Sequence, residues 1–475
     1  MDTASFQFIL FGLAVAAVSN LCRSPDWRLA VLLISSLTFI GMLAHNPLVL
    51  VPLVAFLLIG YAGLQIIANG WFRAKPWLLV AVIFTYIWLK KYTFLPHGIF
   101  LDFPYLTLGL SFIFFRVLHL LIETGDRGPK VGVLQYLVYT LNFTTFVSGP
   151  IQRYDDFAKD QFAKTPIGVT TRVAATQIER LIRGFFKVNV LALILNMFQS
   201  DAVAQLTLPI SLQQKFFSAF EVAILYPFFL YANFSGYIDI VIAIARLLNI
   251  RLPENFDRPF SAASFLEFWS RWHITLSNWL KTYVYNPLLI ALMRRNSSRA
   301  LEPFLGVFCF FVTFFLVGIW HGRTSEFVLF GVLQGGGVAI NKLWQITLTH
   351  WLGFRVYRHV AANPVYTALG RGLTFAWFSF TLVWFWSNWD QIYELFAALG
   401  APAWLAVWGS VWIGAAIVLS SWEWIRARLV TNQTTIGVLT SRYTRVVFAT
   451  VISLMTFAVT TLMSQPAPDI VYKAF

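Results

Sequence analysis

One histidine in this sequence, His321, ends a long apolar segment. The seventeen residues before it, 304–320, carry no charged side chain. An ionisable group in such a segment usually serves a function or has a partner. Apolar surroundings keep an imidazole neutral, and a neutral imidazole can activate a hydroxyl group for attack on a thioester carbonyl. Gly318 and Gly322 leave room for a backbone or a substrate to approach. The alternative is a histidine bonded to a neighbouring helix carbonyl.

A second histidine, His273, lies in the tryptophan-rich segment FWSRWHITLSNWL. The spacing predicts one amphipathic helix over 264–283, with Trp269, His273, Ser277 and Lys281 on one side. An aromatic side would consist of Phe268, Trp272, Leu276 and Trp279. His273 or Asn278 could stabilise an oxyanion as a hydrogen-bond donor. The alternative is an interfacial helix whose histidine sits at headgroup level without chemistry.

Other reactive groups are sparse. His119 shares a helical side with Arg116 and Glu123, which predicts a polar stripe in the protein interior. Cys22 and Cys309 form no metal set, and no metal site is expected. The GxSxG, P-loop, HExxH and CxxC motifs are absent from the sequence. The Gly335–Gly337 run suits close helix packing better than phosphate binding.

The composition indicates an integral membrane protein. Of the 475 residues, 58% are hydrophobic and 12% are charged, about half the roughly 25% of soluble domains. The net charge is +14, but basic residues such as Arg180, Arg183 and Lys187 lie between apolar runs. That pattern favours loops facing anionic lipid and the cytoplasm, and argues against a nucleic-acid partner.

The apolar runs predict an all-α protein of about eleven transmembrane helices, give or take two, with re-entrant or interfacial helices. Each run approaches the ~20 residues that cross a bilayer. The runs are 6–21, 29–44, 47–68, 77–96, 131–150, 184–199, 214–232, 304–321, 325–345, 372–396, 403–422 and 445–464. No linker or repeat interrupts them, so a single polytopic domain over 1–475 is expected. Cytoplasmic loops at Arg23 and Arg73 would place the N-terminus outside.

Five segments together resemble the membrane-bound O-acyltransferase family, in particular its bacterial group that acylates alginate and teichoic acid. The resemblance covers about 100–345, leaving 346–475 as C-terminal transmembrane helices. The segments are GLSFIFFRVLHLLIE, NFTTFVSGPIQRYDDF, YANFSGYIDIVIAIARLLNIRLPENFDRPF, FLEFWSRWHITLSNWLKTYVYNPL and GIWHGRTSEFVLFGVLQG. WHITLS and GIWHG are specific in combination, whereas Gln334 stands where many relatives have histidine. Asn233, Ser270 and Thr282 replace charged residues of the family pattern.

The resemblance implies a membrane-buried tunnel with His321 as the catalytic histidine and His273 as the second characteristic one. The further candidates for substrate or tunnel contact are Trp320, Asn278, Trp272, Ser277, Asn255, Glu254, Asp239 and Gln334. No bound cofactor is implied. The donor would be a cytoplasmic thioester, either acyl-CoA or an acyl carrier protein. The other implied partners are membrane lipid, a glycan acceptor and an extracytoplasmic protein that passes the acyl group on.

The sequence therefore predicts an O-acyltransferase of the bacterial cytoplasmic membrane that moves a small acyl group, most simply acetyl, to a saccharide or a partner protein. The nearest alternative is D-alanyl transfer from a carrier protein, which the basic residues Arg294, Arg295 and Arg299 could dock. Ordinary positive-inside charge also explains those three arginines. A transporter or flippase would instead show inverted repeats and paired intramembrane charges. A catalytically silent scaffold for envelope assembly is the third alternative.

Overall fold

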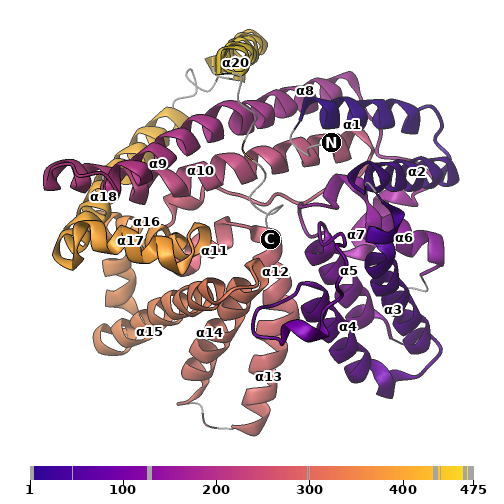
Figure 1. Cartoon of the computed structure of the whole chain (residues 1–475), viewed down its shortest axis with the longest axis horizontal. Coiled ribbons are helices and arrows are strands. Elements are labelled where there is room, and N and C mark those ends of the chain that lie inside the picture. The colour runs from indigo at the N-terminus through magenta and orange to yellow at the C-terminus, as the bar shows by residue number, and fades with distance from the viewer. Residues whose placement is uncertain are drawn as a thin grey trace. The chain divides into compact units, whose positions relative to one another are not determined.

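The computed structural model describes residues 5–44, 46–125, 131–296, 298, 300–431, 437–438, 440–463 and 468 (Figure 1). Arg299 lies outside the described residues. Within them all regular elements are helices, and strand pairing is limited to one isolated bridge between Phe256 and Trp272. This confirms the expected all-α fold.

The chain forms two compact units that interleave in sequence. The first comprises residues 5–185 and 234–254, and the second comprises 186–233 and 255–468. The long helix α10 (Leu212–Leu247) contributes residues to both units.

The first unit contains the N-terminal helices and a buried polar stripe. Its helices are α1 (Phe6–Ser19), α2 (Pro25–Leu43), α3 (Val51–Ala68), α4 (Lys75–Leu89), α5 (Leu110–Glu123), α6 (Val133–Leu141), α7 (Tyr154–Gln161) and most of α8 (Thr171–Phe186). On α5, Arg116 donates hydrogen bonds to the carbonyls of Tyr139 and Thr140 at 3.0 and 2.8 Å. The His119 Nε2 accepts from the Tyr154 N–H at 3.0 Å. Arg116 and His119 are buried as predicted, whereas Glu123 is exposed.

The second unit contains the remaining helices. They are α9 (Leu193–Leu206), α11 (Phe265–Arg271), α12 (Ile274–Leu280), α13 (Asn286–Arg295), α14 (Glu302–His321), α15 (Ser325–Ala361), α16 (Pro364–Trp386), α17 (Trp389–Leu399), α18 (Ala401–Thr431) and α20 (Arg442–Met463). An apolar core joins α9, the first part of α10, α16, α17 and α18 through buried side chains such as Ala223, Phe375 and Val407. This core anchors α16, which carries side chains to the candidate site.

Glycines let α14 and α15 lie side by side (Figure 1). A Cβ on Gly318 would lie 2.1 Å from the Gly331 Cα, and a Cβ on Gly335 would lie 2.5 Å from the Phe311 carbonyl oxygen. Both distances are too short for any side chain, so the backbones of the two helices are in contact. The expected role of Gly318 and Gly335 in close helix packing is confirmed.

Nine helical segments of the described residues are long and apolar enough to cross a membrane, which makes this a multi-pass membrane protein. About eleven spans were expected. The run at 131–150 differs most, because it forms only the nine-residue α6 and a short 3-10 turn, Phe143–Thr145. Asn142 ends α6 and caps the turn, since its side chain accepts a hydrogen bond from the Thr144 N–H.

Candidate active site

The predicted helix over 264–283 is broken at His273. Helix α11 ends at Arg271, Trp272 is extended, and His273 has φ 45° and ψ 51°, in the left-handed region. A residue with that conformation cannot continue a right-handed helix, so α12 begins only at Ile274. The prediction of one continuous amphipathic helix is therefore wrong. The shared polar side is lost with it, since Lys281 is exposed whereas His273 is completely buried.

Asn255 holds the break in place. Its backbone carbonyl accepts a hydrogen bond from the Ile274 N–H at 3.0 Å. Its Oδ1 accepts from the Thr275 N–H at 3.1 Å and from the Thr275 hydroxyl at 2.8 Å. The His273 Nδ1 lies 3.3 Å from the same oxygen. Left-handed backbone at a non-glycine residue costs free energy, and these bonds offset that cost.

The Asn255 contact indicates the tautomer of His273. Because Oδ1 is an acceptor for two Thr275 donors, Nδ1 carries the proton and donates to it. The lone pair of the neutral ring is then on Nε2. His273 lies outside the candidate membrane spans, and burial lowers its pKa from 6.5 to about 3. The imidazole is therefore neutral at physiological pH.

His321 is the last residue of α14 and has an aromatic environment. Its side chain is 4% exposed. Its ring centroid lies 5.2 Å from that of Phe385 on α16 and 6.0 Å from that of Phe330 on α15. The chain turns directly after it at Gly322, where a Cβ would lie 2.1 Å from the Phe327 ring. The α14 to α15 turn therefore fixes His321 between three helices.

Trp320 connects the two histidines. Its ring centroid lies 4.8 Å from that of His321 and 6.2 Å from that of His273. Two imidazoles 48 positions apart in the sequence thus pack on one indole in a buried, mainly aromatic region. Such a region excludes water, which strengthens electrostatic and hydrogen-bonding effects on a reacting group.

Three more predicted residues, Trp272, Ser277 and Asn278, lie in the second unit. The Ser277 N–H donates a hydrogen bond to the His273 carbonyl at 3.1 Å, at the start of α12. Trp272 belongs to an aromatic cluster, stacking on Phe268 at 5.6 Å. Ser277 is half-buried, whereas Asn278 is exposed.

Gln334 has a structural contact that the sequence did not indicate. Its side chain is completely buried on α15, and its amide nitrogen donates to the Thr381 hydroxyl on α16 at 2.8 Å. It therefore links the two helices that carry Phe330 and Phe385. Thr381 lies in an apolar run with no distinguishing motif, so sequence reasoning had no signal for it.

Asp239 and Glu254 belong to the first unit. The Arg180 Nε donates to an Asp239 carboxylate oxygen at 2.9 Å, and its two terminal nitrogens donate to the Glu254 oxygens at 2.7 and 2.6 Å. Both carboxylates therefore form ion pairs with Arg180. No group of three or more histidine, cysteine, aspartate or glutamate side chains in the described ranges could hold a metal ion.

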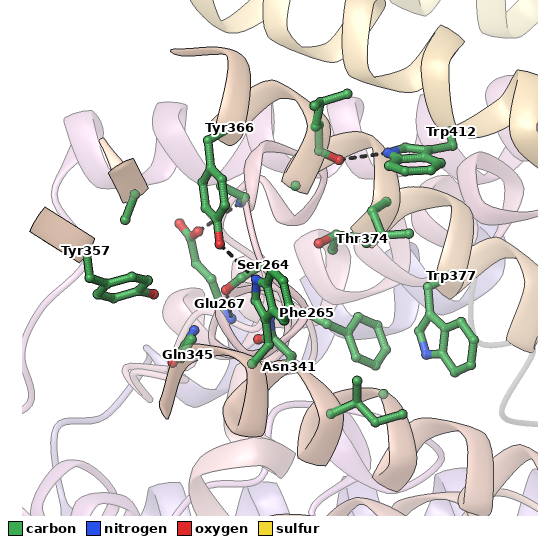
Figure 2. Close-up of a pocket in the computed structure, with 18 residues that line it drawn as sticks. Ser264, Phe265, Glu267, Asn341, Gln345, Tyr357, Tyr366, Thr374, Trp377 and Trp412 are labelled. Carbon is green, nitrogen blue, oxygen red and sulfur yellow. Dashed lines mark hydrogen bonds between the residues drawn. The ribbon is translucent and has the colours of Figure 1, made fainter. Parts of the chain in front are cut away.

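The second unit also contains a cavity of about 630 Å³ between α11, α15 and α16 (Figure 2). Phe265 and Trp377 lie toward one end of the view, and Tyr357 and Gln345 lie toward the other. Neither catalytic candidate is among its lining residues. The cavity is therefore distinct from the region around Trp320.

Comparison with known proteins agrees with the sequence resemblance. A model of the membrane-bound O-acyltransferase family matches residues 64–370, which include both histidines. The chain is 31% identical over 240 residues to a teichoic acid D-alanyltransferase of Streptococcus thermophilus, covering 50% of this chain and 57% of that protein. It is 29% identical over 289 residues to a probable alginate O-acetylase of Pseudomonas fluorescens, covering 59% and 54%. The chain thus spans a little over half the length of these relatives.

Proposed function

Because this chain belongs to the membrane-bound O-acyltransferase family, we propose that it is an O-acyltransferase of the bacterial cytoplasmic membrane. It moves a small acyl group from a cytoplasmic thioester to a hydroxyl group of an envelope saccharide or of an extracytoplasmic partner protein. The observation that carries this proposal is the packing of His321 and His273 on Trp320 in a buried aromatic region.

In the proposed reaction His321 is the general base. It removes the proton from the acceptor hydroxyl while the hydroxyl oxygen forms a bond to the thioester carbonyl carbon. The carbon–sulfur bond then breaks, and the leaving thiolate takes the proton from the imidazolium. The cycle is neutral overall and returns His321 to its starting state.

His273 is proposed to orient the acceptor hydroxyl rather than to donate to the oxyanion. In the tautomer that Asn255 favours, the Nε2 has a lone pair and no proton. It can therefore accept a hydrogen bond from a hydroxyl but cannot donate one to an oxyanion. The exposed Asn278 is a weak candidate for that donor, since an oxyanion hole depends on excluded water.

The acyl group is either acetyl or D-alanyl, since the relatives' names include both chemistries. We propose acetyl from acetyl-CoA as the first assignment. D-alanyl transfer would need an acidic carrier protein at the cytoplasmic face. The exposed Arg294 and Arg295 at the end of α13 would suit such a carrier.

The experiment that tests the acyl assignment compares cells with and without the gene. Base-labile groups are released from isolated envelope polymers and identified by mass spectrometry. Gene-dependent acetate supports acetyl transfer, and gene-dependent alanine supports the carrier-dependent alternative. If neither group depends on the gene, while the protein is present in the membrane, saccharide acylation is contradicted and a transporter becomes the better account.

A matched variant separates the two donors. Arg294→Gln/Arg295→Gln should lower alanine incorporation several-fold if an acidic carrier docks on α13, because the complementary charge is lost. It should leave acetate incorporation from acetyl-CoA unchanged. Arg355→Gln, an exposed arginine on α15, serves as the control for lost surface charge.

A further inference from the structure

A cationic cavity of about 340 Å³ lies in the first unit and takes no part in the proposed chemistry. It is formed by the first part of α8, the end of α10 and the segment that follows α10. Its polar lining consists of Arg172, Thr176, Gln177, Arg180, Arg246, Arg251 and Glu254. Three of the four arginines, Arg172, Arg180 and Arg246, lie within candidate membrane-spanning segments rather than in the loops between them.

Two of the four arginines are neutralised by carboxylates. Arg180 bonds to Asp239 and Glu254, as described above. Arg251 donates to both carboxylate oxygens of the buried Asp160, with nitrogen–oxygen distances of 2.6 to 3.1 Å. These ion pairs fix the walls of the cavity, because each joins segments that are distant in the sequence.

The other two arginines retain unused hydrogen-bonding capacity. The Arg246 Nη2 donates to the Gly168 carbonyl at 3.1 Å, whereas its Nη1 is buried without a hydrogen-bond partner among the described residues. A buried charged donor without an acceptor is costly, so such groups commonly mark a site for a ligand or an ion. Arg172 is exposed at the cavity, and no carboxylate of the described chain pairs with it.

The lining of the cavity is predominantly positive, since it has four arginines and the carboxylate of Glu254. A negatively charged group with several acceptor oxygens would complement this lining. A phosphodiester is such a group, and its oxygens match the donor geometry of arginine.

We propose that this cavity binds a phosphate group, with Arg172 and Arg246 as its direct contacts and Gln177 as a neighbouring polar group. Basic pockets between membrane helices bind the headgroups of anionic lipids, and the positive lining fits the phosphodiester of such a lipid. A soluble phosphate compound, inorganic or part of a coenzyme, offers the same chemistry. Phosphate binding at this site does not depend on acyl transfer, so it can be tested independently of the proposed function.

The first experiment measures lipid retention by the full-length purified protein. Native mass spectrometry would compare phosphatidylglycerol with zwitterionic phosphatidylcholine, each added to delipidated protein. The wild-type chain should retain phosphatidylglycerol preferentially. Arg172→Gln should weaken this retention by about fivefold to tenfold, since one charge-assisted contact is lost.

Arg355→Gln is the control, because it removes an exposed arginine that does not line the cavity. Arg246→Gln is the second variant, but it also alters the bond to Gly168. Arg172→Gln has no such complication, since no hydrogen bond of its side chain is lost within the described chain. Unchanged retention in Arg172→Gln and Arg246→Gln would overturn the proposal.

A second arm distinguishes the sources of the phosphate. Inorganic phosphate and coenzyme A are added separately as competitors, and direct coenzyme A binding is measured for the wild type and Arg172→Gln. Displacement of lipid by either competitor, with weaker binding in Arg172→Gln, would assign a soluble phosphate. If the lipid is retained in the presence of either competitor, the ligand is the lipid headgroup. If neither lipid, inorganic phosphate nor coenzyme A binds, the proposed site is refuted. His321→Ala should bind as the wild type does, which separates this result from any loss of acylation.

Discussion

At the scale of single residues, the distinctive feature is His273 in a left-handed conformation. The sequence identified His273 and Asn255 as candidates, but it placed His273 inside a regular helix. The pattern of tryptophans repeats at helical spacing on both sides of the break, so periodicity carried no sign of it. Only the bonds between Asn255 and residues 274–275 reveal why the chain departs from a helix there.

Asn255→Ala tests this role. The change leaves two Thr275 donors without their acceptor, and burial makes that cost about 1–3 kcal/mol for each unpaired group. We expect a lower thermal unfolding midpoint in detergent and a loss of acylation. Asn278→Ala removes an exposed amide and is the control. Equal stability and activity of Asn255→Ala and wild type would contradict the positioning role.

A pH dependence of stability follows from two buried histidines outside the candidate spans. Burial lowers the pKa of His119 to about 4 and that of His273 to about 3, both below the ordinary 6.5. Between pH 6.5 and about 4 the unfolded chain binds more protons than the folded chain, so stability falls as the pH falls. We expect a lower unfolding midpoint at pH 5 than at pH 7.5.

His119→Gln provides the comparison for that measurement. The glutamine can still accept the Tyr154 N–H bond but does not titrate. Its unfolding midpoint should depend less on pH than that of the wild type. An equal or steeper dependence would show that His119 is not one of the groups responsible.

At the scale of helices, the α14 to α15 pair determines where His321 lies. The sequence predicts both the membrane-spanning helix over 304–321 and the close helix packing at Gly318 and Gly335, and the structure has both. The sequence does not predict the hydrogen-bond partner of Gln334, because its bond to Thr381 depends on how α15 packs against α16. The run at 131–150 also shows the limit of hydropathy, which does not detect a helix stop such as Asn142.

Gly318→Ala tests the close contact of the two helices. The added methyl group would lie 2.1 Å from Gly331, so the helices must separate. We expect a loss of about 1–3 kcal/mol in stability, typical of overpacking, and a reduced rate of acylation because His321 moves with α14. Gly336→Ala is the matched control, since nothing lies within 4 Å of its added Cβ. Similar behaviour of the two variants would contradict the packing argument.

At the scale of the whole molecule, the prediction concerns the membrane orientation. From the exposed Arg23 next to Cys22 and the positive-inside rule, we predict that this loop faces the cytoplasm. Cys22 is exposed and Cys309 is buried, so the native chain has one accessible thiol among its two cysteines. We expect a membrane-impermeant maleimide to label Cys22 only after the cytoplasmic face is opened. Labelling of the wild type in intact spheroplasts would contradict this orientation, provided that Cys22→Ser is not labelled.

The proposed mechanism depends most directly on His321, and measuring the acylation of envelope polymers in cells tests this role. Wild type, His321→Ala and the exposed control His350→Ala would be compared at equal membrane levels, with base-labile acyl groups released and quantified. A loss of the catalytic base should reduce the gene-dependent signal at least ~100-fold in His321→Ala and leave His350→Ala unchanged. Equal acylation by His321→Ala and wild type would contradict the proposed mechanism.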